Sequence, residues 1–453
     1  MKKDTFYNII LILFTILILS IFINYNIYLI INKYIWFITI IMLFGGGFYF
    51  SYKLNFIQLR LVKIIKYLFR NKTKNGDIST FESVSMTLAA QIGVGSIAGV
   101  SLAIYLGGPG TIFWMWISGI ITSINSFVES VLGVLFQEKD YNQVYIGGPS
   151  YYIKKGLGNH KLAYFYAFLI IISYIVGFIT IQSNTIVNVT NAYLNKYLVL
   201  IILSIISSYI IFKDVKSIAK FSSIIVPIMG LIYFIIGFII IYNNVDKIGV
   251  IFSLIISSAF NIKSGIIGFI TPIIIGIQRG IFACESGIGT SAIASSTTNE
   301  KPKKEGFIQM FGVYFTILVI CTITGFIILL SDYQSLNIIN PNGIEITSYA
   351  FNYHLGNIGK YILAIVTILF AYSTIISGYY YGESSLKFLV KKCPKIYIVL
   401  FKIITITLLF IGGIIKPSII WNIVDSLVAF LAIINMYSIY KLFRYVIKEY
   451  KNN

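Results

Sequence analysis

Two apolar segments interrupted by glycine are the parts of this sequence whose residues could do chemistry. They read AAQIGVGSIAG over residues 89–99 and RGIFACESGIGTSAIA over residues 279–294. Where such a helix unwinds in a membrane, its freed carbonyls suit a small cation and its freed N–H groups suit a carboxylate. We therefore predict broken helices that bind a zwitterion and a metal cation together. The alternative is that the glycines, as in Gly95-x-x-x-Gly99, only let helices pack closely.

A pair of hydroxyl residues, Ser373 and Thr374, lies deep in a third apolar segment, residues 359–389. Hard cations prefer oxygen ligands, so this pair is a candidate cation site. The alternative is that each hydroxyl bonds the carbonyl four residues earlier, as Ser and Thr often do in helices.

Ionisable residues inside apolar segments need a partner or water, because each costs roughly 2.5–3.5 kcal/mol at the bilayer centre. We expect Arg279 to form a structural or gating ion pair with Glu285, or alternatively with Glu129. Glu383 and Asp425 lie near the ends of apolar segments, where we expect water to reach them.

Membrane-spanning helices are the elements that must position these residues. The chain has 453 residues, of which 57% are hydrophobic and only 11% are charged, whereas about 25% are charged in a soluble domain. Its apolar runs are apolar on every face, unlike the alternating strands of a barrel. We predict an all-α polytopic membrane protein; without a nucleophile–base pair or a metal-ligand cluster, we do not expect an enzyme. About twelve runs are long enough to be candidate spans: 7–31, 34–54, 83–105, 110–136, 162–193, 196–212, 217–242, 266–295, 306–331, 359–389, 396–415 and 417–440.

The formal net charge of +19 sits in short loops between apolar runs, so it indicates membrane topology rather than nucleic-acid binding. Cation-rich loops alternate with cation-poor ones at 106–109, 243–265 and 332–358. This pattern predicts a plasma membrane protein with both termini in the cytoplasm if the first run spans. Residues 55–70 predict a basic amphipathic helix on an anionic inner leaflet, or alternatively a loop that only sets topology.

Counting the first interrupted helix itself, five spans precede the second interrupted helix, so the two interrupted helices run in opposite directions. Two five-helix repeats of inverted topology, each beginning on a broken helix, give this arrangement. We predict four regions: N-terminal peripheral spans with a basic segment at 1–80, a first repeat at 81–245, a second repeat at 246–442 and a cytoplasmic tail at 443–453.

Several motifs resemble the alanine or glycine:cation symporter family of bacteria and archaea. The similar stretches are IGVGSIAGVSLAIYLGGPGTIFWMW from residue 92, GGPSYYIKKGL from residue 147, RGIFACESGIG from residue 279, VICTIT from residue 319 and FAYSTIISGYYYGE from residue 370. The resemblance extends over most of the chain. It implies a LeuT-like (leucine-transporter) fold of ten core helices, the first and sixth discontinuous, plus one or two extra N-terminal spans.

The resemblance implies that sodium is the co-transported ion, held between the first broken helix and the eighth core helix, and it implies no organic cofactor. In this sequence the sodium ligands would be the carbonyls of Ala89, Ile92 and Phe370 and the hydroxyls of Ser373 and Thr374.

The resemblance also places the substrate. The carboxylate would meet N–H groups at Gly93, Gly95 and Ser96. Gln182 and Asn184, which match a family motif on the third core helix, would face the cavity. The alternative for these two side chains is hydrogen bonding between helices, worth about 0.6–2 kcal/mol per pair.

The chain departs from the family pattern at six positions that bear on the substrate. They are Gln91 for a small residue, Val94 for Thr, Ser96 for Asn, Cys284 for Asn, Thr316 for Asp and Gly378 for Trp. Loss of the Trp side chain at Gly378 enlarges or reshapes the pocket, and Gln91 takes back some of the room. With Cys284 as a further contact, we expect a substrate somewhat larger than alanine.

Together these patterns predict a secondary active transporter that takes up a small neutral amino acid with sodium by alternating access. A proton-coupled or uncoupled amino-acid transporter on the same fold is the nearest alternative, and a channel is a more distant one. The patterns do not predict the oligomeric state.

Overall fold

The computed structural model describes residues 3–70, 80–140, 143–213, 215–261, 265–336, 341–390 and 394–452. These residues are nearly all helical, as predicted, and the sheet among them is a two-stranded antiparallel hairpin. In this part of the chain, eight helices are long and apolar enough to cross a membrane, and a bent pair of helices forms a ninth candidate span. Three shorter apolar helices cover the remaining predicted runs.

The helices and strands occur along the chain in the following order. The first are α1 (Lys3–Ile23), α2 (Tyr25–Lys53), the 3-10 turn η1 (Ile57–Leu59), α3 (Leu61–Arg70), α4 (Thr80–Gln91), the 3-10 turn η2 (Val94–Ser96), α5 (Ala98–Gly107), α6 (Thr111–Leu135), β1 (Glu138–Lys139), β2 (Tyr145–Ile146), α7 (Pro149–Gly156), α8 (His160–Ile172), the π-helical segment η3 (Ser173–Phe178), α9 (Ile179–Thr190), α10 (Lys196–Ile211) and α11 (Val215–Tyr242). The others are α12 (Val245–Ala259), α13 (Gly265–Cys284), α14 (Thr290–Ser295), α15 (Pro302–Tyr314), the π-helical segment η5 (Phe315–Cys321), α16 (Thr322–Leu329), the 3-10 turn η6 (Tyr333–Ser335), α17 (Ile344–Leu355), α18 (Asn357–Leu389), α19 (Lys395–Gly412) and α20 (Pro417–Asn452).

Some boundaries differ from those predicted. The first helix ends at Ile23 instead of residue 31, because the Asn24 side chain caps α2 by accepting the Asn26 N–H at 2.8 Å. The cation-poor segments 243–265 and 332–358, predicted as loops, contain α12 and α17. These helices are too short to span a bilayer, so a search for spans missed them.

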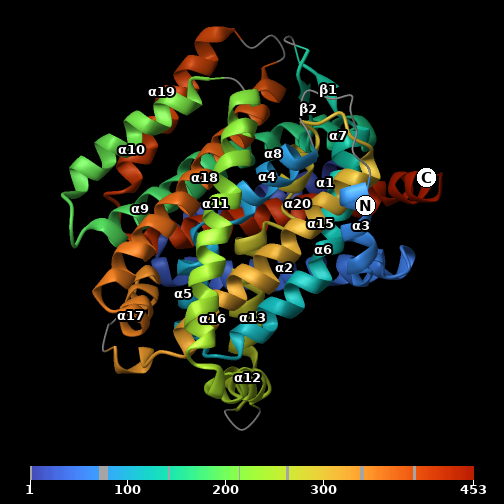
Figure 1. Cartoon of the computed structure of the whole chain (residues 1–453). Helices are drawn as coiled ribbons and strands as arrows, with labels where there is room; N and C mark the ends of the chain where they lie inside the picture. The colour runs from blue at the N-terminus through green and yellow to red at the C-terminus, as the bar shows by residue number, and fades with distance from the viewer. Residues whose placement is uncertain are drawn as a thin grey trace.

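The helices differ in how deeply they are buried, and this separates the centre of the molecule from its rim. In the most apolar stretches of α6 and α20, 83% of the residues are buried, against 33% in α11 and 22% in α19. A helix that is apolar on every face and also buried belongs to the core, whereas the exposed apolar helices suit lipid. Figure 1 shows α20 and α6 passing through the centre, with α10 and α19 at the rim.

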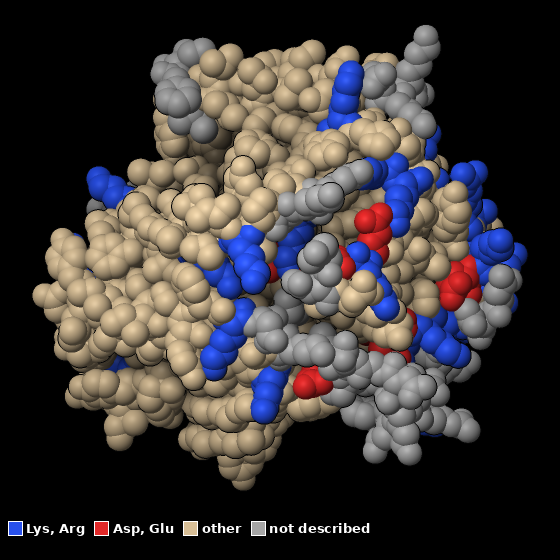
Figure 2. Space-filling model, turned by 90° about the horizontal axis from the view of Figure 1, so that it is seen from above, with Lys and Arg blue, Asp and Glu red and all other residues tan. Residues whose placement is uncertain are grey.

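The end of the molecule that carries the β1–β2 hairpin is rich in basic side chains. α12 and α17 lie at one end and the β1–β2 hairpin and α7 at the other (Figure 1). Viewed from the hairpin end, the surface carries many Lys and Arg side chains among a few acidic ones (Figure 2). Lys and Arg side chains are thus seen at the hairpin end (Figure 2), whereas the segments that contain α12 and α17 are poor in cations in the sequence.

The predicted amphipathic segment is helical over α3, which includes the exposed apolar side chains of Leu61, Val62 and Ile65. The chain turns sharply just before it, where Asn55 and Phe56 adopt positive φ angles of 53° and 51°. α3 is therefore a separate helix and no continuation of α2.

Candidate functional site

The first interrupted helix breaks where its glycines predict. α4 ends at Gln91, η2 follows, and α5 resumes at Ala98, with a bend of 59° between the two halves. Gly93 is extended (φ −110°, ψ −165°), so the last carbonyls of α4 lack helical partners. All residues from 85 to 101 are buried, which places these polar groups inside the protein rather than against lipid.

Two hydroxyl groups on α18 reach the end of α4. The Ser373 Oγ lies 3.2 Å from the Ala89 carbonyl oxygen and 2.9 Å from that of Phe370. The Thr374 Oγ1 lies 3.2 Å and 3.1 Å from the same two oxygens. Four of the five predicted sodium ligands thus form one buried group, which we call the α4–α18 oxygen cluster. Among the described residues, neither hydroxyl bonds the carbonyl of the fifth, Ile92.

Gln182 approaches the same break from α9. Its Oε1 accepts the Val94 N–H at 3.1 Å, at the N–H end of the break. A Cβ at Gly93 would lie 2.6 Å from the Thr374 Oγ1 and 3.0 Å from the Gln182 Nε2, so glycine is needed for both side chains to come this close. The Ser96 Oγ donates to the Gly93 carbonyl at 2.7 Å and so turns back onto the break itself.

The structure does not bring Asn184 to the break. Its Nδ2 donates to the carbonyls of Gly412 and Ile415 at 3.1 Å and 2.7 Å, at the end of α19. Residues two apart on a helix do not face each other, so Asn184 points away once Gln182 faces the break. The expectation that both side chains face the cavity was therefore wrong, and Asn184 instead links two helices.

Three other predicted substrate contacts surround the break at different places. The Gln91 side chain turns toward α15, where a Cβ at Gly312 would collide with its Oε1. Gly378 faces η3, and a Cβ there would lie 3.0 Å from the Tyr174 ring. Cys284 is fully buried as the last residue of α13.

The second interrupted helix also breaks at its glycines. α13 ends at Cys284 and α14 begins at Thr290. Gly287 and Gly289 have φ angles of +82° and +91°, which glycine adopts without steric cost. Glu285 has a φ of +55°, which is a strained value for a residue with a side chain.

Glu129 on α6 fills this second break. Its Oε2 accepts the Gly289 N–H at 2.9 Å and the Asn435 Nδ2 at 2.5 Å. Asn435 also donates to the Gly287 carbonyl at 2.9 Å. The N–H end of the second break is therefore occupied by a carboxylate of the protein itself.

The predicted pairing of Arg279 with Glu285 or Glu129 was wrong. Arg279 pairs with Asp425 on α20, through an Nη1–Oδ1 distance of 3.1 Å and an Nη2–Oδ2 distance of 2.6 Å. Its guanidinium also lies 4.8 Å from the centre of the Trp421 ring. Asp425, which was expected to meet water, is only 3% exposed. Buried acids need such a partner, and Arg279 supplies two charge-assisted hydrogen bonds.

The remaining intramembrane acids have partners as well. Glu285 accepts the Tyr174 hydroxyl at 2.8 Å. Glu383, also expected to meet water, is 9% exposed; it accepts the Tyr379 hydroxyl and pairs with Lys387 at 2.9 Å. Each of these acids therefore meets the requirement for a partner without Arg279.

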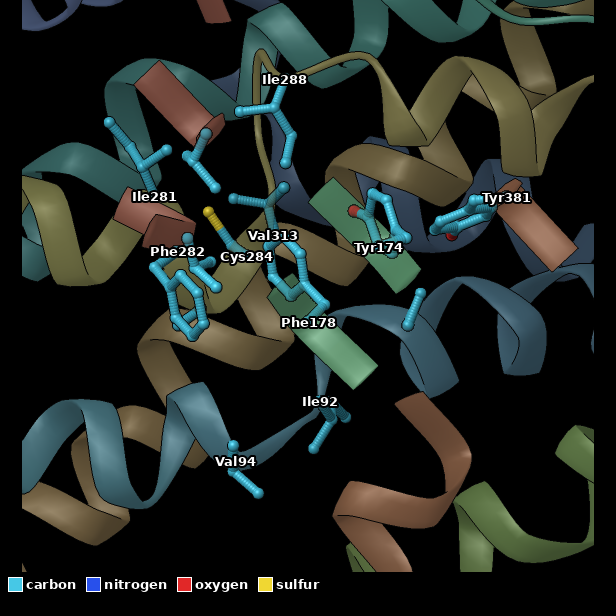
Figure 3. Packing of buried hydrophobic residues seen from close by; sticks show 14 of the residues in the cluster. Ile92, Val94, Tyr174, Phe178, Ile281, Phe282, Cys284, Ile288, Val313 and Tyr381 are labelled. Carbon is cyan, nitrogen blue, oxygen red and sulfur yellow. The ribbon is translucent and has the colours of Figure 1, made fainter. Parts of the chain in front are cut away.

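Aromatic rings pack the two breaks against each other. Phe282, just before the second break, stacks on Phe178 with ring centres 5.0 Å apart, and Phe178 stacks on Tyr174 at 4.7 Å. A Cβ at Gly95 would lie 2.8 Å from the Phe282 ring, so the first break touches this stack directly. Figure 3 shows these rings with Cys284 beside Phe282 and Val313, and with Ile92 and Val94 of the first break further down in the view.

Sequence reasoning noted Asp425 but not its pairing with Arg279, and it missed three other residues of this site: Trp421, Tyr174 and Asn435. The sequence did contain a signal for the pairing of Arg279 with Asp425. Both residues lie in apolar segments, where an acid and a base each need a partner and can pair with each other. Tyr174, Trp421 and Asn435 carried no such signal, because aromatic and amide side chains occur widely in membrane helices.

A multi-helical membrane fold with two helix breaks buried at its centre defines a membrane transporter rather than an enzyme. The chain belongs to the sodium:alanine symporter family, whose pattern it matches over residues 22–453. The resemblance stated from its motifs is thereby confirmed.

Several relatives match nearly the whole chain. It is 36% identical over 424 residues to the probable sodium/glutamine symporter GlnT of Bacillus subtilis, covering 92% of this chain and 87% of the relative. It is 34% identical to the amino-acid carrier protein AlsT of the same organism (93% and 90% covered) and 32% identical to the sodium/alanine symporter AgcS of Methanococcus maripaludis (93% and 95%). Among solved structures, the manganese transporter of Eremococcus coleocola matches with a TM-score of 0.52 at 14% identity, over 80% of this chain and 78% of that one. That likeness concerns the fold alone.

Proposed function

We propose that this protein takes up a small neutral amino acid, alanine-like or somewhat larger, together with sodium by alternating access. The observation that carries the proposal is the α4–α18 oxygen cluster. Four oxygens from Ala89, Phe370, Ser373 and Thr374 converge at a helix end, in the chemistry that a hard cation prefers. The carbonyl of Ile92, in the same break, is the proposed fifth ligand.

The substrate carboxylate binds at the other end of the same break in this proposal. Its partners are the backbone at Gly93, Gly95 and Ser96, where the Gln182 Oε1 now accepts the Val94 N–H. When a cation and a carboxylate bind within the same break, each increases the affinity of the protein for the other. Coupling of substrate transport to sodium requires this reciprocal effect on affinity.

Filling of the second break by Glu129 supports a structural role for that region. Its N–H end already has a carboxylate, so we assign Glu129, Glu285 and Arg279 to holding the unwound segment and closing the site. Direct binding of the substrate carboxylate there would require displacing Glu129.

The size of the substrate pocket is set in this proposal by Gln91, Cys284 and Gly378. Glycine at 378 leaves the Tyr174 ring free to approach α18. The names of the relatives include both a glutamine and an alanine symporter, which is the range that we propose for this chain.

For the architecture we propose two inverted repeats, over residues 81–245 and 246–442. In support, each has a helix that breaks as its first apolar span: α4–α5 opens the first, and α13–α14 follows the short helix α12 in the second. Residues 1–80 are peripheral in this scheme, and residues 443–453 form a cytoplasmic tail.

We place the protein in the plasma membrane with both termini in the cytoplasm and α3 on the anionic inner leaflet. The gathering of Lys and Arg at the end away from α12 and α17 supports this orientation (Figure 2). One sodium ion falling through a potential of about 100 mV supplies about 2.3 kcal/mol, enough for a roughly fiftyfold gradient.

The test combines ligand binding with uptake. The purified protein is heated with each of the twenty amino acids in sodium and in choline, and proteoliposomes are assayed for uptake of the compounds that stabilise it. We expect a small neutral group to raise the melting temperature only in sodium, because a ligand of the native state stabilises it. Equal uptake in choline, or uptake driven by a proton gradient alone, would show that sodium is not the coupling ion.

A further inference from the structure

α15, η5 and α16 run alongside the first broken helix in the same direction. Near the start of this contact the Gln309 Nε2 donates to the Thr87 Oγ1 at 2.5 Å. Further along, the Thr324 Oγ1 donates to the carbonyl of Ser96 at 2.8 Å. The turns between these two contacts therefore lie beside the break.

Two buried polar groups on this contact have no hydrogen-bond partner among the described residues. The Gln91 side chain lies against Gly312, with its Oε1 unpartnered and the residue only 3% exposed. Thr316 follows one turn after Gly312 on the same face and is fully buried, and its Oγ1 is also unpartnered. It stands at the start of η5, where π-helical turns disturb the usual bond to the carbonyl four residues earlier.

Native proteins pair nearly all buried polar groups, so these two atoms point to a ligand. The Gln91 Oε1 needs a donor, whereas the Thr316 hydroxyl can donate. A primary carboxamide offers an NH₂ donor and a carbonyl acceptor side by side, and it can satisfy both groups at once. The methyl group of alanine satisfies neither.

We propose that Gln91 and Thr316 form a polar subsite that recognises the side-chain carboxamide of the transported amino acid. The substrate class is then glutamine and asparagine. This inference rests on the proposed function, since it requires an amino acid whose carboxylate lies in the first break. Because Gly312 has no side chain, the Gln91 side chain can pack directly against α15.

The test compares L-glutamine, L-asparagine and L-alanine on the full-length purified protein in sodium. We expect both carboxamides to bind at least about tenfold more tightly than alanine, because a site built for hydrogen bonds discriminates against a ligand that lacks them. Gln91→Met and Thr316→Val should each weaken glutamine binding about tenfold and change alanine binding by less than about twofold.

Thr87→Val is the matched control, because it removes a hydroxyl from the same helix contact at a pair that lies before the break. It should leave the ratio of glutamine to alanine affinity unchanged. Tighter binding of alanine than of glutamine by the unaltered protein overturns the subsite, as does an equal loss for all three ligands in both variants. A change in sodium dependence without a change in the substrate ratio overturns it too. If no amino acid binds in sodium, the proposed function itself fails.

Discussion

The first break, at the end of α4, and the second, at the end of α13, both unwind at a Gly-x-Gly sequence, yet different groups fill them. At the first, neutral hydroxyl and amide groups of Ser373, Thr374 and Gln182 contact the backbone. At the second, the Glu129 carboxylate and the Asn435 amide bond the backbone directly. The second break is thus completed by an acidic side chain of the protein itself, whereas in the proposed function the neutral groups at the first break give way to an ion and a zwitterion.

Of the substitutions that test this difference between the two breaks, the loss of Arg279 should have the largest effect on stability. Arg279→Met leaves the Asp425 carboxylate buried without its partner, and stability should fall by about 3–5 kcal/mol. Thermal unfolding in detergent measures this loss. The double variant Arg279→Met/Asp425→Leu should recover most of it, because no unpaired charge remains. An unchanged melting temperature in the single variant would show that the pair does not hold the second break.

Truncation of Glu129 comes next. Glu129→Ala leaves the Gly289 N–H without its acceptor and removes one of the bonds that the Asn435 amide donates, and the loss should be about 2–3 kcal/mol. Glu129→Gln keeps an acceptor at this position and should lose less. The sodium concentration for half-maximal uptake should stay the same in Glu129→Gln. If it rises instead while the melting temperature stays constant, the cation belongs at the second break and the comparison is reversed.

The first break should respond in the opposite way. Replacing both hydroxyls, as Ser373→Ala/Thr374→Val, should raise the sodium concentration for half-maximal uptake at least about tenfold, or 1.4 kcal/mol. Stability without sodium should also fall, by about 1–3 kcal/mol, because the buried Ala89 carbonyl loses both donors. Ser377→Ala is the control, because its hydroxyl lies one turn further along α18 and donates to the Ser373 carbonyl at 3.0 Å. Unaltered sodium dependence in the double variant would remove the α4–α18 oxygen cluster from the mechanism.

The smallest expected effect is that of Tyr174→Phe. The substitution removes the hydroxyl that donates to Glu285 at 2.8 Å and keeps the ring that stacks on Phe178. Stability should fall by about 1 kcal/mol, the net value of one hydrogen bond. The sodium concentration for half-maximal uptake, measured in the same preparation, should be unchanged. A shift in that concentration would show that the second break influences sodium binding at the first.

The sequence predicted the local features of this site and missed the distant ones. The helix ends at Gln91 and Cys284 follow from glycines that lie beside them in the chain, and both breaks are confirmed. The pairing of Arg279 with Asp425 joins residues 146 positions apart, and no local pattern encodes it. The prediction that Asn184 faces the cavity was wrong for a different reason. It assigned Gln182 and Asn184 to the same face of one helix, although residues two apart do not share a face.

The fold shows the same division. Long apolar runs predicted the spans, because a continuous hydrophobic segment is a strong signal by itself. α12 and α17 were missed because each is short and lies between spans, where helix formation depends on packing against neighbours. The π-helical segments η3 and η5 also went unpredicted, and no sequence pattern considered above marks them.

Burial of both breaks means that, in this arrangement, a captured solute would be cut off from water on either side. Every residue from 85 to 101 and from 279 to 298 is buried. Under the proposed alternating access, entry from one compartment and exit to the other would require two different rearrangements. The depth of the unwound backbone would then keep stray ions from crossing the membrane.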